Sequence, residues 1–153
     1  MRIAPRSKGA DIECYNKLIY LHAALCEALR LYPSVPFQAK VPMELDILQS
    51  GHQLDPSMQI IISMYAMGRI KSIWGEDCYE FKPERWISEG VLAFNAGPRT
   101  CIGKNMAFIQ MKAVAATTIS SYRIQAVPRQ TVIPNVSIIL RMKHGFKVMV
   151  SPA

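Results

Sequence analysis

The sequence contains no run of hydrophobic residues long enough to cross a membrane as a helix. The longest candidate, residues 106–119, is short and includes Gln110 and Lys112. Residues 1–11 are basic and polar, so they lack the apolar centre of a secretory signal peptide. Internal repeats and low-complexity segments are absent too, and a length of 153 residues suits one compact domain.

Cysteine is scarce and irregularly spaced. The four cysteines form no Cys-x-x-Cys pair, which argues against a zinc site. They also show no pattern typical of a disulfide framework, so a reducing compartment fits the composition best. The four are Cys14, Cys26, Cys78 and Cys101.

Acidic residues are outnumbered: 11 Asp and Glu stand against 18 Lys and Arg, which gives a formal charge of +7 at pH 7. Such a charge favours acidic partners. The basic residues are scattered along the sequence and no nucleic-acid-binding motif is present, so nucleic acid is not a predicted partner. An acidic protein surface and an anionic membrane surface account for the charge equally well.

One cysteine lies in a loop that glycine and proline define. Gly97 and Pro98 predict a turn, because glycine tolerates positive φ and proline presets φ. A long apolar segment follows Cys101, and a helix there would direct its free N–H groups and positive dipole end toward the sulfur. Together with the charge of Arg99, this favours a thiolate, the form that ligates haem iron. The simpler alternative is that Cys101 is a small buried hydrophobic residue.

Two charged residues lie inside a predicted helix. Apolar residues recur at spacings of three and four from Asn16 onward, and Pro33 ends the pattern. Glu27 and Arg30 are three apart and therefore share a face of this helix. One interpretation is an ordinary surface ion pair of little energetic worth. The other is a buried ion pair, because the neighbouring residues are Leu, Ala and Cys. The apolar positions are Leu18, Leu21, Leu25, Ala28 and Tyr32.

The remaining segments predict short strands and one further long helix. A helical turn is expected at 65–74, between two regions of strands. The helix after Cys101 should run to about residue 122 and be deeply buried, because it is apolar nearly all round. The predicted strands are residues 37–41, 59–64 (a buried strand), 123–127, 136–140 and 146–150.

Three motifs together resemble those of the cytochrome P-450 monooxygenases, and they occur in that family's order. Residues 94–103 match the pattern of the haem-binding loop, Phe-x-x-Gly-x-Arg-x-Cys-x-Gly. Residues 27–30 match a Glu-x-x-Arg helix motif, followed by Leu-Tyr-Pro. Residues 83–86 resemble the family's Pro-x-Arg-aromatic segment.

The resemblance implies a role for each residue of the cysteine loop. Cys101 would be the proximal thiolate ligand of the haem iron. Arg99 would reach a haem propionate, and Phe94 would pack beside the sulfur. Gly97 and Gly103 would complete the cofactor-binding set.

The resemblance also implies a structural charge network of Glu27, Arg30 and Arg85, in which one carboxylate accepts from two guanidinium groups. Its role would be to lock the core beside the cysteine loop. The neighbouring Trp86 is expected to serve as plain core packing.

For the fold, the resemblance implies a mainly α structure with small β-sheets, corresponding to the C-terminal, proximal and haem-ligand part of the cytochrome P-450 fold. Residues 1–14 would be a poorly ordered segment and residues 15–153 the P-450 part. Finer features at 31–37, 65–77 and 108–113 look like those of plant fatty-acid ω-hydroxylases and wax-alkane hydroxylases.

The function implied is insertion of one oxygen atom from O₂ into a C–H bond of a fatty acid or alkane, with haem as cofactor. Electrons would come from NADPH through a reductase with an acidic docking face, to which Lys104 and Lys112 would present a basic surface. A full-length member would lie at the cytosolic face of the endoplasmic reticulum membrane, held by parts missing from this chain.

A complete family member is several times longer and carries a distal, oxygen-handling helix that this chain lacks. We therefore expect the isolated chain to be inactive. One alternative is a non-catalytic truncated fragment that binds haem weakly or not at all. Another is a small basic interaction domain with a structural cysteine.

Overall fold

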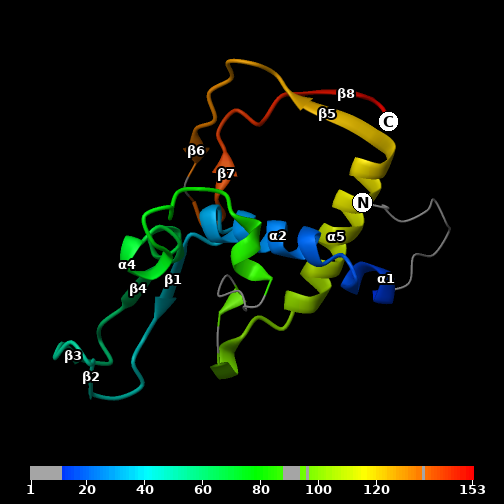
Figure 1. Ribbon diagram of the computed structural model, residues 1–153. Helices are drawn as coiled ribbons and strands as arrows, with labels where there is room; N and C mark the ends of the chain where they lie inside the picture. The colour runs from blue at the N-terminus through cyan, green and yellow to red at the C-terminus, as the bar shows by residue number, and fades with distance from the viewer. Residues whose placement is uncertain (1–11, 88–93, 96, 136) are drawn as a thin grey trace.

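The computed structural model describes residues 12–87, 94–95, 97–135 and 137–153 (Figure 1). Most of the predicted poorly ordered segment, residues 1–11, lies outside this range. Residues 12–14 begin helix α1, Ile12–Asn16. Helix α2, Ile19–Leu31, follows after a short break. The helix predicted from Asn16 is thus present but begins at Ile19, and α1 includes residues 12–14 of the segment predicted to be poorly ordered.

Helix α2 is the central element of the core. It ends at Tyr32, whose N–H donates to the carbonyl of Ala28 at 2.7 Å, directly before Pro33. Its buried face holds apolar and charged side chains together. The members of this face are Ala23, Cys26, Glu27, Arg30 and Leu31.

Two small antiparallel sheets follow α2. Strand β1, Phe37–Lys40, pairs with β4, Ile60–Ser63, and β2, Asp46–Ile47, pairs with β3, Gln53–Leu54. The predicted strands 37–41 and 59–64 are therefore confirmed in position. The second is not fully buried, because a two-stranded sheet has one free face: Ile61 is 65% exposed.

Three short helical turns lead from the sheets toward the cysteine loop. Helix α3, Met64–Met67, is capped by the Ser63 hydroxyl, which accepts from the Ala66 N–H at 3.2 Å. Helix α4, Lys71–Trp74, ends at Gly75, whose φ of 85° suits glycine. The 3₁₀ helix η1, Pro83–Trp86, then packs on α2.

Helix α5, Lys104–Ser121, crosses α2 in Figure 1 and follows the 3₁₀ turn η3, Gly97–Arg99. The predicted helix is present, but its expected deep burial is wrong for this chain. One side is covered, and the other sides remain exposed: Met106 is 65%, Val114 68% and Ile119 54% exposed.

The chain ends in a ribbon that arches away from α5 (Figure 1). Strand β5, Tyr122–Ala126, pairs antiparallel with β8, Val148–Pro152. Strands β6, Pro134–Asn135, and β7, Arg141–Met142, form a smaller pair. The strand predicted at 136–140 is wrong: residue 136 lies outside the described residues, and 137–139 form the bend between β6 and β7.

The core lies where α2, η1 and α5 meet. Ala23, Cys26, Trp86 and Phe108 form its buried centre, and five partly buried side chains pack against them. The five side chains that pack against this centre are Leu25, Leu29, Trp74, Phe94 and Met111.

Among the residues that the structure describes, no helix is long and apolar enough to cross a membrane.

Candidate functional site

The loop around Cys101 is held by its own backbone hydrogen bonds. The N–H of Cys101 donates to the carbonyl of Phe94 at 2.8 Å, and the Thr100 N–H donates to the Gly97 carbonyl at 3.0 Å. Asn95 and Gly97 have φ values of 64° and 70°, so the chain turns twice through the left-handed region. This tight turn leaves Cys101 exposed.

Helix α5 begins three residues after the cysteine, at Lys104, with Gly103 as its N-cap residue. The Lys104 N–H donates to the Cys101 carbonyl at 3.2 Å. A Cβ added to Gly103 would lie 3.8 Å from the Cys101 sulfur, an ordinary contact. The described protein atoms alone therefore do not require glycine at position 103.

Cys101 lines a cavity of about 430 Å³ between its own loop and β1. Phe94 and Asn95 contribute from the loop side, and Leu29 contributes from α2. The other residues that line this cavity are Ser34, Val35, Phe37, Gln38, Ala39 and Lys40. Because Cys101 is exposed, the alternative of a buried structural cysteine is wrong for it.

Phe94 connects the cysteine loop to the core. Its ring lies 5.3 Å from that of Phe108 on α5, which in turn lies 4.5 Å from the ring of His22 on α2. Phe94 therefore anchors the loop and lines the Cys101 cavity at once. Arg99 is exposed, and none of the ion pairs between described residues includes it.

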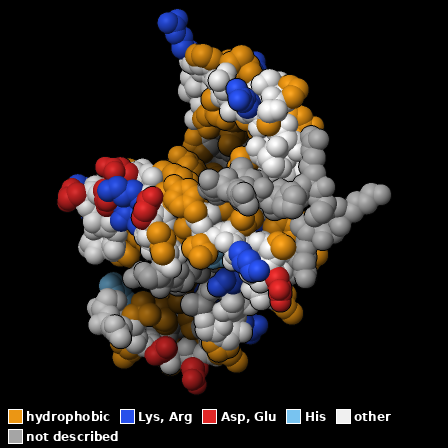
Figure 2. All heavy atoms as spheres, turned by 45° about the vertical axis from the view of Figure 1, so that its right-hand side comes forward, with side chains coloured by type: hydrophobic (Ala, Val, Ile, Leu, Met, Phe, Trp, Pro, Cys, Tyr) orange, Lys and Arg blue, Asp and Glu red, His pale blue; other side chains and the backbone are white. Residues whose placement is uncertain are grey.

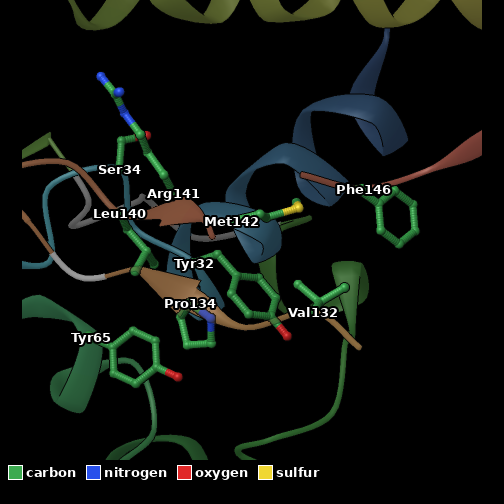
Figure 3. Close-up of a pocket in the computed structure, with 9 residues that line it drawn as sticks. All are labelled: Tyr32, Ser34, Tyr65, Val132, Pro134, Leu140, Arg141, Met142 and Phe146. Atoms are coloured by element: carbon green, nitrogen blue, oxygen red, sulfur yellow. The ribbon is translucent and has the colours of Figure 1, made fainter. Parts of the chain in front are cut away.

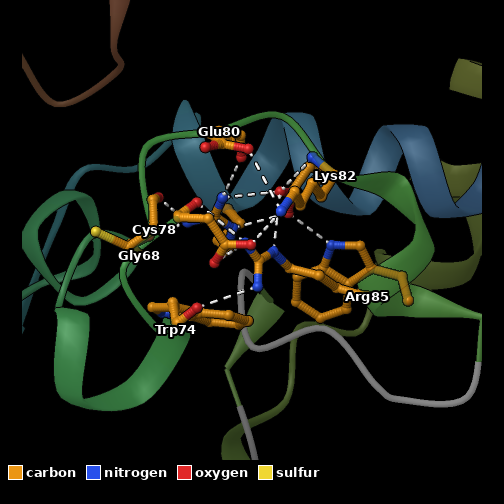
Figure 4. Close-up of polar contacts among 10 residues, drawn as sticks. Gly68, Trp74, Cys78, Glu80, Lys82 and Arg85 are labelled. Atoms are coloured by element: carbon orange, nitrogen blue, oxygen red, sulfur yellow. Dashed lines mark hydrogen bonds and ion pairs between the residues drawn. The ribbon is translucent and has the colours of Figure 1, made fainter.

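Glu27 and Arg30 form a buried, bidentate ion pair. The Arg30 Nε donates to Glu27 Oε2 at 2.7 Å, and Nη2 donates to Oε1 at 2.8 Å. Arg30 also donates to the carbonyls of Gly68, Cys78 and Glu80 (Figure 4). Its guanidinium thereby ties α2 to the segment between α3 and η1.

Arg85 lies beside this pair but is held mainly by another carboxylate. Its Nε is 3.6 Å from Glu27 Oε1 and makes no hydrogen bond among the described residues. Its Nη2 lies 2.6 Å from Asp77 Oδ1, and Nη1 donates to the Trp74 carbonyl at 3.1 Å. Hydrogen bonds from Lys82 and Arg85 lower the pKa of the Asp77 carboxyl to about 2.

Trp86 does more than fill the core, contrary to the expectation from sequence. It is buried, and its indole N–H donates to Glu27 Oε2 at 2.8 Å. A buried indole N–H needs an acceptor. A tryptophan expected in the core was therefore the signal in the sequence for such a contact. Asp77 had no comparable signal, because the carboxylate faces Arg85 only after the chain folds.

Lys112 is not part of a basic surface, which corrects another expectation. It lies buried at the contact of α5 with α1, where its Nζ donates to the carbonyl of Tyr15 at 3.0 Å. Burial lowers the pKa of its ammonium group. Burial, followed by the charges of Lys112 and Lys104, also lowers the pKa of His22.

A second, larger cavity of about 650 Å³ lies where the C-terminal segment meets α2 and α3 (Figure 3). Tyr32 and Tyr65 line it, together with Phe146. It contains none of the residues that the sequence marked for chemistry, so the Cys101 cavity is the candidate site.

Residues 1–150 match the family model described as Cytochrome P450. The chain belongs to the cytochrome P450 family. Its similar proteins include alkane hydroxylase MAH1 of Arabidopsis thaliana, 50% identical over 151 residues, or 92% of this chain and 30% of that protein. Noroxomaritidine synthase 2 of Narcissus aff. pseudonarcissus MK-2014 is 49% identical over 150 residues, or 92% of this chain and 29% of that protein.

Cytochrome P450 86B1 of Arabidopsis thaliana is 45% identical over 142 residues, covering 87% of this chain and 25% of that protein. These relatives confirm the predicted resemblance to the plant ω-hydroxylase branch of the P450 family. The chain spans about 30% of the length of the curated relatives that it matches.

A solved structure confirms the predicted fold class. The crystal structure of a cytochrome P450, CYP102L1, superposes with a TM-score of 0.84 at 23% identity, over 92% of this chain and 33% of that one. A likeness at this identity concerns the fold alone. The helices and small sheets described above are thus arranged as in part of a P450.

The residues around Cys101 are of the types that can hold a haem group. Cys101 is an exposed sulfur on a hydrogen-bonded loop, and it lines a cavity whose walls are largely apolar. The contrast with Cys26 is clear, because burial raises the pKa of that thiol to about 11. Cys26 is a core residue, whereas Cys101 is exposed beside a cavity.

Proposed function

We propose that this chain is the haem-thiolate portion of a P450 monooxygenase that inserts one oxygen atom from O₂ into a C–H bond of a fatty acid or alkane. The observation that carries the proposal is the exposed Cys101 on its self-bonded loop, facing an apolar cavity beside β1. The name of the alkane hydroxylase relative supports an aliphatic substrate.

The chain's own residues divide the binding work. Cys101 would supply a thiolate to the haem iron, Arg99 is exposed and would pair with a propionate, and Phe94 would give the sulfur an apolar neighbour. Gly97 provides the turn, and Gly103 keeps the backbone beside the sulfur bare. When bound, haem supplies oxygen activation, to which electron donation from a thiolate ligand contributes.

The buried ion pair has a supporting role in this proposal. Glu27 holds α2 against η1 by accepting from the Trp86 indole, and Arg30 ties α2 to the segment before η1. Leu29, one residue earlier than Arg30, lines the Cys101 cavity. Phe94 rests on the same core through Phe108. Leu29 and Phe94, which line the cavity from two sides, therefore pack against the same buried core.

For a whole protein of this kind, we propose electron delivery from NADPH through a reductase, and a position at the cytosolic face of the endoplasmic reticulum membrane. Of the two lysines expected on a docking face, Lys104 at the start of α5 remains a candidate, whereas Lys112 is buried. Nucleic acid is not among the partners that we propose.

A second candidate is a non-catalytic fragment of the same fold, and the exposure of Cys101 favours it. The described residues around that sulfur do not exclude water, which a monooxygenase site requires. Both candidates predict that Cys101 is the ligand of the haem iron, provided that haem binds.

The absorption spectrum of the ferrous carbonyl form tests the assignment. The purified chain with added haem should show the red-shifted band of a thiolate-ligated carbonyl complex, and Cys101→Ser should abolish it. Cys14→Ser is the matched control, because Cys14 is also exposed. An unchanged band in Cys101→Ser would refute the ligand, and no haem binding by the parent would leave only the non-catalytic fragment.

A further inference from the structure

The carboxylate of Glu27 has no room for a second guanidinium group. It accepts two hydrogen bonds from Arg30. It accepts one more from the Lys82 N–H and one from the Trp86 indole. The two oxygens of a carboxylate offer about four acceptor sites, so these donors fill it. Accordingly, the Nε of Arg85 stays 3.6 Å from Glu27 Oε1 and makes no hydrogen bond among the described residues.

Asp77 supplies the negative charge that Arg85 needs. Its Oδ1 lies 2.6 Å from Arg85 Nη2, and the same Nη2 donates to the Asp77 backbone carbonyl at 3.0 Å. The other carboxylate oxygen accepts from Lys82. The pKa of Asp77, lowered to about 2 by these hydrogen bonds, keeps the group ionised at neutral pH. Each of the two guanidinium groups in this part of the core thus has a carboxylate of its own.

The backbone around Asp77 holds its carboxylate in place. The Cys78 N–H donates to the Gly75 carbonyl at 3.2 Å, and the Glu80 N–H donates to the Asp77 carbonyl at 2.9 Å. Gly75 has a φ of 85°, and a Cβ added there would lie 3.3 Å from Asp77 Oδ1, a tight contact. Glycine at position 75 therefore provides both the turn and the space beside the carboxylate.

Arg85 carries this hold to the neighbouring tryptophan. Arg85 and Trp86 are adjacent in η1, and Arg85 also donates to the Trp74 carbonyl at 3.1 Å (Figure 4). The position of η1 decides whether the Trp86 indole N–H reaches Glu27 Oε2, which it does at 2.8 Å. A shift of η1 would therefore weaken this buried hydrogen bond.

Trp86 in turn supports the cavity of the candidate site. It shares the buried core with Phe108. Leu29 and Phe94 pack against that core, and both line the Cys101 cavity. The position of η1 therefore affects the packing beneath two residues of the cavity wall.

We propose that Asp77 is a positioning residue for the haem-thiolate site, because it fixes η1 through Arg85. Asp77 does not touch the cavity itself. It acts through Arg85 on the place of Trp86 in the core, and so on the support of the Cys101 loop. The consequence for haem rests on the proposed function, whereas the positioning of Trp86 does not.

The alternative is that Asp77 and Arg85 form an ordinary surface ion pair, which would contribute little. Figure 2 shows acidic and basic side chains gathered on the left of the molecule, the side on which Figure 1 places α4. Lys71 and Glu76 form an ordinary pair of this kind, with side chains 59% and 87% exposed. Asp77 and Arg85 are 29% and 20% exposed, and Arg85 is also bonded to two backbone carbonyls. These differences favour the positioning role.

Hydrogen exchange of the indole N–H groups, followed by NMR on the full 153-residue chain without haem, tests the positioning. The chain has two tryptophans, so each indole gives its own signal. Asp77→Asn should speed exchange at the Trp86 indole roughly ten-fold, because its hydrogen bond to Glu27 opens more often. The Trp74 indole, which donates to the Met67 carbonyl at 2.8 Å, should change far less.

Glu76→Gln is the matched control, because it removes the exposed carboxylate next to Asp77 and should leave both exchange rates unchanged. Arg85→Gln completes a double-mutant cycle. In that background Asp77→Asn should have little further effect on the Trp86 indole, since the partner of the carboxylate is gone. If Arg85→Gln does not fold, the comparison of Asp77→Asn with Glu76→Gln decides alone.

The ferrous carbonyl spectrum measures the consequence at the haem. At equal bound haem, Asp77→Asn should lose part of the red-shifted thiolate band that the parent and Glu76→Gln retain. A parent without this band would refute the proposed function, and indole exchange would still decide whether Asp77 positions Trp86.

Three results would overturn the proposal. Equal exchange at the Trp86 indole in Asp77→Asn and Glu76→Gln would show that the pair is an ordinary surface ion pair. An undiminished effect of Asp77→Asn in the Arg85→Gln background would show that Asp77 does not act through Arg85. Faster exchange with an unchanged thiolate band would separate Asp77 from the haem site.

Discussion

At the scale of single residues, Glu27 is a fully buried carboxylate with four hydrogen bonds. Its carboxylate accepts two hydrogen bonds from Arg30, one from Trp86 and one from the Lys82 N–H at 2.9 Å. Burial alone would raise the pKa of the Glu27 carboxyl, but these hydrogen bonds outweigh burial and lower it below 4.5.

We predict that Glu27→Gln lowers the free energy of unfolding by about 3–5 kcal/mol, because it leaves the buried charge of Arg30 without its counter-ion. Since the folded-state pKa of Glu27 is lowered, its stabilisation is fully present above pH 4.5 and is lost as the pH falls through the folded value. The variant should therefore also unfold with a weaker dependence on acid.

Urea unfolding followed by the fluorescence of Trp74 and Trp86 measures both effects. Glu84→Gln is the control, because Glu84 is an exposed carboxylate on the same 3₁₀ helix as Trp86. It should change the unfolding free energy by about 0.5 kcal/mol or less. Equal stability of the two variants would mean that Glu27 is solvated in solution.

At the scale of elements, α2 packs closely against Gly68, the residue at the end of α3. A Cβ added to Gly68 would lie 2.2 Å from the backbone carbonyl oxygen of Arg30, which cannot move without shifting α2. The Gly68 carbonyl in turn accepts from the Arg30 guanidinium. Gly68 and Arg30 thus make two contacts, a close approach of their backbones and a hydrogen bond. Together these contacts set the distance between α2 and the end of α3.

We predict that Gly68→Ala destabilises the fold by about 1–3 kcal/mol through this overpacking. Gly68 has a φ of −65°, so backbone strain from the new residue is not the cause. Gly103→Ala is the matched control: its φ is −81° and the nearest atom to the new Cβ is 3.8 Å away. Thermal unfolding of both variants checks this, and equal melting temperatures would contradict the packing argument.

At the scale of the whole molecule, the candidate haem site around Cys101 is open on one side among the described residues. Cys101 is exposed, and Met106, Val114 and Ile119 of α5 are each more than half exposed. A monooxygenase needs a dry, shaped cavity around the reacting atoms. The described residues provide one wall of such a cavity.

We therefore predict that the isolated chain, supplied with haem, NADPH and a reductase, forms no hydroxylated fatty acid or alkane. Water reaching the haem should instead divert reductant to peroxide. Product analysis, with free haem as the negative control and a full-length P450 hydroxylase as the positive control, measures this. Hydroxylated product above the free-haem level and dependent on NADPH would prove the prediction wrong.

The sequence alone determined the features that depend on neighbouring residues. The turn at Gly97, the helix after Cys101 and the ion pair of Glu27 with Arg30 all follow from short spacings, because local backbone geometry places residues that are three or four apart. The family and its fold class were also evident, since the three motifs are local patterns.

Only the tertiary structure decided the contacts between distant segments. Asp77 binds Arg85 more closely than Glu27 does, Trp86 donates to Glu27 across 59 positions, and Lys112 reaches the Tyr15 carbonyl. Such pairings depend on how whole helices pack, which no local spacing specifies.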